Sequence, residues 1–599
     1  MAVVPLAFFD GGYFPTAWGV PALVGLWIAT VAVSLAPTPL SRHEAVALAA
    51  LGALLGWSAL SFLWSDDRPQ TVLEVERLTI YVAGLAALLF VARRQSVPWL
   101  LGGTATAIVV ACGAGLAELL FQDLFGRPEA RIRDVGALHA PVGYSNALGG
   151  LSAIGVLILV GFLAQARRPF LRSVAAAAGV VLLAALTLSL SRGAWLGLVT
   201  GAVVAVCLAP RRVAFSGWLL VLGLPGTALL ALALRADALL TRGASEAAAV
   251  REGHRLALAI VALAAGAALL AAFGPRLVAR ARAATPTGRA AGGLLLLGAL
   301  ALGAAALWAT EPDEPAGAAP RAAPRVSDPT QRVLHPSVGR RERLWEAAWN
   351  DFEAHPVHGS GSGTFGRYWL EHRTVGRFVR DAHSLYLETL AEVGLVGLIL
   401  LLVALAAPVA SAVGARGEPL VPATLGAYSV YAVQAGVDWL WEMPVPTTAA
   451  LACGAALLVA GRPASSRRLT RPARVGVAGL ALALGALSFV ALIGNNATAS
   501  SERALAAGKL EQAETHARRA TTWLPWAAEP WLVLARTQRR SGDRRAARES
   551  LDRALELDPG NWLLWYERGL AVTGAERRRS FARASRLNPR DMRQLVGRD

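Results

Sequence analysis

The sequence contains few charged residues, few cysteines and almost no lysine. Charged residues make up 17% of its 599 residues, whereas hydrophobic residues make up 55%. A soluble protein carries about a quarter charged residues, so this composition excludes an ordinary soluble protein and predicts a membrane protein with many spans. Cys112, Cys207 and Cys453 each lie in an apolar run. They indicate small buried side chains, and neither a disulfide framework nor a metal site.

The net charge of +17 comes almost wholly from arginine, because Lys509 is the only lysine. Most arginines of the hydrophobic part fall in short connections between apolar runs, as the positive-inside rule requires of cytoplasmic loops. We therefore attribute this charge to membrane topology and expect no nucleic-acid partner. Much arginine, alanine and glycine is typical of a GC-rich, bacterial genome. Residues 1–20 lack a basic start and contain Asp10, so we expect no cleavable signal peptide.

Apolar runs long enough to cross about 30 Å of hydrocarbon recur from residue 18 to residue 494. We expect about 14 spans from this pattern of runs and polar connections. They lie near 18–36, 44–64, 77–92, 98–120, 146–164, 173–190, 193–209, 214–234, 255–273, 290–308, 383–407, 421–437, 446–461 and 474–494.

Arginine pairs in every second connection orient these spans. Arg93-Arg94, Arg167-Arg168 and Arg211-Arg212 mark connections that we expect on the cytoplasmic side. The loop 309–382 and both chain ends are then expected on the extracytoplasmic side of the membrane. The first part of that loop, 311–329, is rich in proline and alanine and is typical of a linker, whereas residues 343–349 have a helical pattern.

The last hundred residues are polar and repetitive. Gly508, Ala513, Ala520 and Pro525 recur 34 residues later, which is the period of tetratricopeptide repeats. Such repeats bind peptides or partner proteins, or they form a helical array without a ligand. We predict an all-α fold, a polytopic membrane helical bundle with a C-terminal soluble helical-repeat domain. Its segments are N-terminal transmembrane helices over 1–308, a large extracytoplasmic loop over 309–382, C-terminal transmembrane helices over 383–497, and repeats over 498–599.

Two apolar spans meet at a tight outward turn around Ser191 and Arg192. Ser191 can cap the following helix, whose first turn then presents N–H groups and the positive end of the helix dipole. Together with the Arg192 guanidinium, these donors suit a phosphate or diphosphate. The alternative is an arginine that extends to lipid headgroups.

A second polar group opens the apolar run that begins at His383. We expect Asp381 to cap this helix, and the helix dipole to favour the neutral imidazole, which can accept a proton from a sugar hydroxyl. Glu388 and Glu392 enter the same run, and acids within a membrane rarely serve packing alone. The alternative is an interfacial histidine that hydrogen-bonds a neighbouring loop.

Three further polar stretches allow more than one interpretation. Residues 361–366 match G-x-G-x-x-G but follow no strand, so we expect a turn that approaches a sugar or phosphate and no dinucleotide site. A proline separates His355 from His358, which disfavours a metal site. Asp438 and Glu442 stand among tryptophans that either form an aromatic belt or bind a saccharide.

Three stretches, 191–197, 343–365 and 382–397, resemble the O-antigen ligase and polymerase superfamily of membrane glycosyltransferases. The likeness covers about residues 40–460, and the chain departs from the family pattern at Ser384, where asparagine commonly follows the histidine. The resemblance implies a GT-C-like bundle of about 12–14 transmembrane helices in the bacterial cytoplasmic membrane. It also implies an undecaprenyl-diphosphate-linked glycan donor on the outer face, and no metal or other cofactor.

The resemblance also implies roles for individual residues. Arg192 and Arg343 would engage the donor diphosphate, and His383 would be the catalytic residue that activates the acceptor hydroxyl. Because arginines can neutralise the departing pyrophosphate, they can replace a metal ion. The further residues that we predict to bind substrate are Ser191, Arg341, Asp438 and Glu442.

The sequence leaves the acceptor and the exact reaction open. Ligase and polymerase chemistry need the same donor, and the acceptor is a lipid, a growing polysaccharide or a protein. The C-terminal repeats add a possible protein partner. A rival interpretation is a transporter of an anion or of a lipid-linked glycan, although the inverted repeats common in transporters are not evident. A weaker one is a scaffold of a cell-envelope assembly.

Overall fold

The computed structural model describes residues 3–36, 38–125, 137–240, 245–284, 338–373 and 378–596. Side chains are described for all of these except 237, 275–284, 338–340 and 594–596. The contacts divide the chain into two units, each made of three separate stretches of the sequence. Unit 1 comprises Met1–Gly12, Ala92–Ser337 and Pro408–Arg462, and unit 2 comprises Tyr13–Val91, Val338–Ala407 and Pro463–Asp599.

Unit 1 is built around α8 (Ser145–Gln165), which is buried along almost its whole length. Small residues let its neighbours approach closely, as is common among membrane helices. At one crossing, Gly201 of α10 (Arg192–Leu208) and Gly426 of α19 (Val421–Ala435) lie so close that a Cβ on either would collide with the other's carbonyl oxygen. The other elements are α1 (Val3–Ala7), η1 (Asp10–Gly12), η4 (Arg94–Ser96), α5 (Val97–Leu120), α6 (Gln122–Phe125), α9 (Pro169–Leu188), α10 (Arg192–Leu208), α11 (Arg212–Ala233), α12 (Asp237–Leu240), α13 (Glu246–Ala284), α19 (Val421–Ala435), η5 (Leu440–Glu442) and α20 (Pro444–Ala460).

Unit 2 combines the first spans, the described part of the large loop and the C-terminal helices. Its one two-stranded sheet within the described residues pairs β1 (Pro39–Leu40) antiparallel with β2 (Arg467–Arg468). Its helices up to the repeats are η2 (Pro15–Ala17), α2 (Gly19–Leu35), α3 (Arg42–Leu60), η3 (Ser61–Leu63), α4 (Arg68–Val91), α16 (Val338–Ala354), α17 (Phe365–His372), α18 (Leu385–Gly414), whose last residues belong to unit 1, and α21 (Arg471–Ala506).

Nine helices in the described part of the chain are long and apolar enough to cross a membrane. The mostly helical membrane fold that the sequence predicts is therefore confirmed. Four further predicted spans correspond to α4, α10, α19 and α20, which are helices but are more charged or shorter. The predicted span 290–308 and the linker 311–329 lie outside the described residues.

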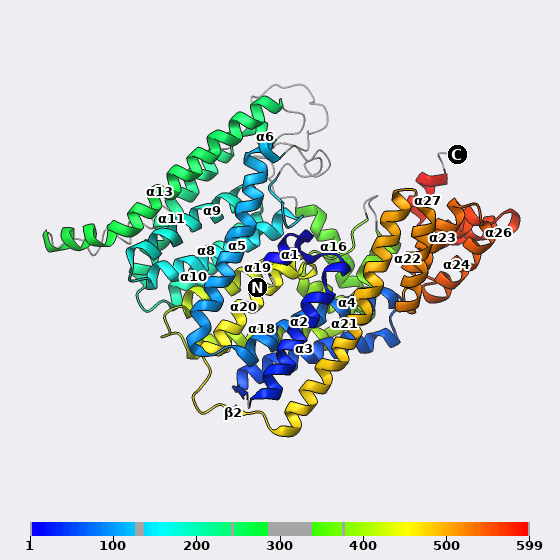
Figure 1. Ribbon diagram of the computed structural model, residues 1–599, viewed down its shortest axis with the longest axis horizontal. Helices are drawn as coiled ribbons and strands as arrows, with labels where there is room; N and C mark the ends of the chain where they lie inside the picture. The colour runs from blue at the N-terminus through cyan, green and yellow to red at the C-terminus, as the bar shows by residue number, and fades with distance from the viewer. Residues whose placement is uncertain are drawn as a thin grey trace. The chain divides into compact units, whose positions relative to one another are not determined.

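The predicted repeats form a helical array in unit 2 (Figure 1). Gly508 and Gly542, which are 34 residues apart, both adopt the left-handed conformation, with φ of 74° and 92°, in equivalent turns between helices. The helix α21 runs from the last apolar span into this array without a break, so residue 498 lies inside a helix. The array continues with α22 (Leu510–Trp523), α23 (Glu529–Arg540), α24 (Arg544–Leu557), α25 (Trp562–Ala571), α26 (Gly574–Leu587) and α27 (Pro589–Val596).

Candidate active site

The residues predicted to act on a substrate fall into both units. Ser191, Arg192, Asp438 and Glu442 belong to unit 1, whereas Arg341, Arg343 and His383 belong to unit 2. We therefore describe two groups of polar residues, one in each unit.

In unit 1, the turn between α9 and α10 has the form that the sequence predicts. Leu190 adopts a left-handed conformation, with φ of 52°, which turns the chain sharply after α9. Ser191 is the N-cap of α10, since its Oγ accepts a hydrogen bond of 3.3 Å from the amide of Ala194. Arg192 is the first residue of the helix and is partly exposed. Its guanidinium and the positive end of the helix dipole thus stand at the same helix end, which suits a bound anion.

Glycines seat this helix end against α8 and α19. A Cβ at Gly149 of α8 would lie 2.6 Å from the Ser189 Oγ and 2.9 Å from the Ser191 Cβ. On the other side, a Cβ at Gly193 would lie 3.5 Å from the Cγ of Gln434, near the end of α19. A side chain at Gly149 would push α10 away, whereas a Cβ at Gly193 would make ordinary van der Waals contact, so Gly149 is the glycine that fixes where the N-terminus of α10 lies.

Asp438 follows α19 and orders the polar residues around this end of unit 1. Its carboxylate is 1% exposed and accepts hydrogen bonds from Tyr144 Oη at 2.8 Å, Asn146 Nδ2 at 2.6 Å and the amide of Trp439 at 2.9 Å. Gln434 Nε2 in turn donates to the Asn146 carbonyl at 2.8 Å. The carboxylate therefore holds these internal donors in place, and its contact with a substrate stays a prediction.

The sequence did not identify Gln434 or Tyr144 of unit 1 as candidate functional residues. The Oε1 of Gln434 is buried and has no hydrogen-bond partner among the described residues, which is costly and leaves an acceptor for a hydroxyl or water. The ring of Tyr144 packs against that of Trp439, with centroids 4.5 Å apart and planes tilted by 35°. A polar residue one helical turn before Asp438 was the available signal for Gln434. Glu442 lies in η5 and is buried.

In unit 2, amides of the glycine-rich loop (residues 361–366) donate to the carboxyl group of the chain's own Glu392. The Glu392 carboxylate accepts hydrogen bonds from the amides of Gly363 at 2.8 Å and Phe365 at 3.1 Å. The amide of Gly361 donates to the Glu392 carbonyl at 2.7 Å. The prediction that these amides approach a sugar or phosphate is therefore wrong, because a buried side chain of α18 already occupies them.

Helix α18 is interrupted at Gly394, two residues after Glu392. The φ of 68° and ψ of −169° at Gly394 are accessible to glycine but not to other residues. The amide of Leu395 donates to the Pro356 carbonyl at 3.0 Å, and Trp57 Nε1 donates to the Val393 carbonyl at 2.9 Å. Protein groups thus satisfy the backbone at the break, as a membrane environment requires.

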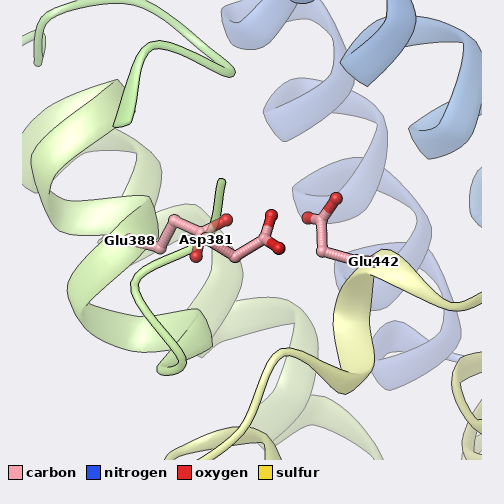
Figure 2. A group of neighbouring side chains, drawn as sticks. All are labelled: Asp381, Glu388 and Glu442. Carbon is pink, nitrogen blue, oxygen red and sulfur yellow. The ribbon is translucent and has the colours of Figure 1, made fainter. Parts of the chain in front are cut away.

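His383 stands immediately before α18 in a left-handed conformation, with φ of 58°. The predicted cap by Asp381 is wrong: Ser384 caps α18, with its Oγ accepting from the Leu387 amide at 3.4 Å. Serine is among the residues that favour the N-cap position. Glu388 reaches back to accept from the Ala382 amide at 2.7 Å, and Figure 2 shows its carboxylate beside that of Asp381.

The imidazole of His383 is oriented by the main chain. Its Nδ1 lies 3.1 Å from the carbonyl oxygen of Asp381. A carbonyl oxygen only accepts, so this contact assigns the proton of a neutral ring to Nδ1 and makes Nε2 the acceptor nitrogen. A neutral ring in this tautomer is suited to act as a general base.

Helix α16 carries the two predicted arginines of unit 2. Arg341 is partly exposed and Arg343 is exposed. The opposite face of α16 belongs to a core that also includes α17, the residue before His383 and the first part of α18, so the structure places the arginine-bearing helix and His383 in one packed assembly. That core consists of Leu344, Ala347, Ala348, Phe365, Trp369, Ala382 and Ala391.

His355 and His358, the two histidines near the end of α16, contact other residues. His355 Nδ1 lies 3.7 Å from Asp351, a buried residue to which Ser360 Oγ donates at 2.8 Å. Burial raises the pKa of Asp351. His358 Nδ1 lies 2.7 Å from the Gly359 carbonyl, and its ring packs against Trp64. Both rings therefore help to hold the end of α16 and the glycine-rich loop.

Comparison with known families finds two matches in the chain. Residues 247–402 match the family described as O-antigen ligase, and residues 504–566 match the tetratricopeptide repeat. The chain is a membrane protein with an O-antigen ligase domain and a tetratricopeptide repeat. The ligase domain includes Arg341, Arg343 and His383, whereas Ser191 and the other predicted residues of unit 1 lie outside the matched range.

The family assignment sets the broad chemistry. A ligase domain implies a lipid-linked glycan as substrate, and the repeat indicates interactions with protein. None of the curated proteins matches the chain.

Proposed function

We propose that the protein transfers or polymerises a glycan from an undecaprenyl-diphosphate carrier onto an acceptor hydroxyl, without a metal ion. The observation that carries this proposal is backbone strain at the predicted residues. Among the described residues, three non-glycine residues have positive φ, namely Asp10, Leu190 and His383. Leu190 immediately precedes Ser191, and His383 is the predicted base itself. Strained backbone of this kind costs about 1–3 kcal/mol per residue and gathers at functional sites.

Asp10, the third of these residues, belongs to the same part of unit 1. A Cβ at Gly143 would lie 3.3 Å from the Asp10 Oδ1. Gly143 directly precedes Tyr144, which donates a hydrogen bond to Asp438. All three strained residues therefore adjoin, or belong to, the groups that the sequence marked as chemical.

His383 acts as the general base in this proposal. Its Nε2 accepts the proton of the acceptor hydroxyl as the oxygen attacks the anomeric carbon of the donor sugar. The new carbon–oxygen bond forms while the bond between the anomeric carbon and the phosphate oxygen breaks. The electron pair leaves with the carrier diphosphate, and the proton remains on the imidazole until it is released to solvent.

The arginines stabilise the departing diphosphate. Arg192 adds a charged guanidinium to the capped N-terminus of α10, and Arg343 offers a second one on the exposed face of α16. Charge-assisted bonds from arginine to phosphate are strong and can be bidentate, so they replace the charge that a metal ion would supply. Ser191 and Asp438 position this end of α10 and its surroundings, and we assign Arg341 and Glu442 supporting contacts to the substrate.

The proposal places the reaction at the outer face of a bacterial cytoplasmic membrane, where the large loop and the repeats would also lie. It accommodates ligase and polymerase chemistry alike, with a lipid, a polysaccharide or a protein as the acceptor. The arginine distribution between the spans supports this orientation.

The test is glycan transfer in membranes of a strain that lacks the protein, complemented at matched expression. Arg192→Ala and His383→Ala should each abolish the carrier-dependent product and cause the lipid-linked donor to accumulate. Arg212→Ala is a matched control because Arg212 is an exposed arginine that also begins a helix, α11, and His43→Ala removes an exposed histidine of α3. If both site variants transfer glycan like the wild type, the assignment fails and transport becomes the better explanation.

A further inference from the structure

The repeat array has a regular row of buried residues along one edge. In three successive units, the residue that ends the first helix precedes a proline: Leu524, Asp558 and Asn588. Each amide donates to a carbonyl four residues earlier at 2.9 Å, so the three turns have the same local geometry. All three residues are buried, at 4%, 4% and 0% exposed. We call these three residues the pre-proline edge.

Each residue of the pre-proline edge contacts a part of unit 2 outside the repeats. Leu524 packs against α21 so closely that a Cβ on Gly494 would collide with it. Asp558 accepts a hydrogen bond of 2.6 Å from Arg367 Nη2, and Asn588 Oδ1 accepts one of 2.9 Å from Arg373 Nη2. Arg367 lies on α17 and Arg373 is its C-cap, so two of the three units hold the same short helix of the large loop.

Arg367 lies between acidic residues from two different segments. Besides Asp558, its Nη2 lies 3.0 Å from the carboxylate of Asp67, which precedes α4, and its Nη1 donates to the Asp66 carbonyl. A Cβ on Gly560 would lie 2.3 Å from the Arg367 Nη1, so this repeat turn packs directly against the guanidinium. A guanidinium with two carboxylate partners is a specific junction, because loss of one partner leaves a buried charge uncompensated.

Arg373 forms a second junction and is still more deeply buried. Its side chain is 1% exposed, and its Nη2 also donates to Asp591 at 2.7 Å. Asn588 Nδ2 donates to Asp591 Oδ2 at 2.8 Å. This hydrogen bond orients the two side chains that accept from the Arg373 guanidinium. Neither Asp558 nor Asn588 follows from the repeat pattern, since the equivalent residue in the first unit is Leu524.

We propose that the repeats dock on α17 of the same chain through the pre-proline edge and thereby hold the segment that leads to His383. The other face of α17 makes the connection. Phe365 and Trp369 lie in the core that includes Ala382, and a Cβ on Gly366 would lie 3.4 Å from the Arg380 Cα. A shift of α17 would therefore displace residues 380–382 and the histidine that follows. A protein partner of the repeats must use a surface other than this edge.

The test measures amide hydrogen exchange of the full-length protein in nanodiscs, for wild type, Arg367→Gln, Arg373→Gln and Arg367→Lys. Arg545→Gln is the matched control, since Arg545 is a strongly exposed repeat arginine whose ion partner, Glu549, lies on its own helix. We expect exchange over 365–372 to accelerate at least tenfold in both glutamine variants and to change far less in Arg367→Lys, which keeps a cation between the carboxylates. Exchange within α22–α25 should stay unchanged, which shows that the array remains folded. Unchanged protection of 365–372 in both glutamine variants overturns the docking.

A transfer assay on the same variants tests the link to His383, and only this arm rests on the proposed function. Transfer should fall at least tenfold in Arg367→Gln and recover partly in Arg367→Lys. If exchange accelerates but transfer is unaffected, the positioning role is overturned. If the wild type itself transfers no glycan while exchange responds as expected, the proposed function fails and the docking stands.

Discussion

Replacing Glu392 by glutamine should loosen the glycine-rich loop without changing the shape of the side chain. In the wild type, the two carboxylate oxygens accept from the amides of Gly363 and Phe365. Glutamine keeps one acceptor oxygen but turns its NH₂ group toward the second amide, which is left buried without a partner. Leaving a buried amide without its acceptor costs about 1–3 kcal/mol. At about 1.4 kcal/mol per factor of ten, the loop should open about five to one hundred times more often.

Hydrogen exchange over residues 359–365 measures this opening directly. The control is Glu353→Gln, because Glu353 is an exposed acid of α16 that accepts a hydrogen bond from Trp349 on the same helix. The control should exchange like the wild type. If Glu392→Gln also exchanges like the wild type over 359–365, the carboxylate does not hold the loop, and the account of the break at Gly394 is wrong as well.

Three further predictions concern single positions. Gly394→Ala should reduce the yield of folded protein and shift thermal unfolding downward in detergent, because a Cβ would collide with the Val357 carbonyl in a conformation that costs about 1–3 kcal/mol for other residues. Burial raises the pKa of Asp67 to about 6 from its ordinary 3.8. The stability that the protonated Asp67 carboxyl contributes is therefore fully present below pH 3.8 and is lost as the pH rises through 6. Asp67→Asn should remove this pH dependence, so that the thermal midpoint of the variant changes less than that of the wild type between about pH 4 and 7. Asp438→Asn should reduce glycan transfer about tenfold or more, because its NH₂ group would face the Asn146 donor at a cost of about 1–3 kcal/mol. Transfer by the variant at the wild-type rate would show that Asp438 does not position the site.

The features that depend on local sequence could be predicted. Ser191 before a run of helix-forming residues indicated its cap, and the 34-residue period indicated the repeats. Both signals arise within one turn or one repeating unit, where side chain and backbone interact over short distances. Most predicted spans are helices for the same reason, since length and apolar composition decide them.

The features that depend on long-range pairing could not be predicted. Nothing near Gly363 in the sequence shows that Glu392, 29 residues later, would occupy its amide. The cap at Ser384 in place of Asp381 depends on the left-handed turn at His383, which local propensity disfavours. The role of Asp558 was equally hidden, because its partner Arg367 lies 191 residues earlier.

The most direct test of the central claim is transfer by the purified protein in nanodiscs. The donor is an undecaprenyl-diphosphate glycan, the buffer contains EDTA, and mass spectrometry follows both the glycosylated acceptor and the released carrier diphosphate. The account predicts that wild type and His43→Ala form both products in equal amounts, and that His383→Ala forms neither while still binding the donor. Product formation by His383→Ala at the wild-type rate, or a wild type that requires added metal, would contradict it.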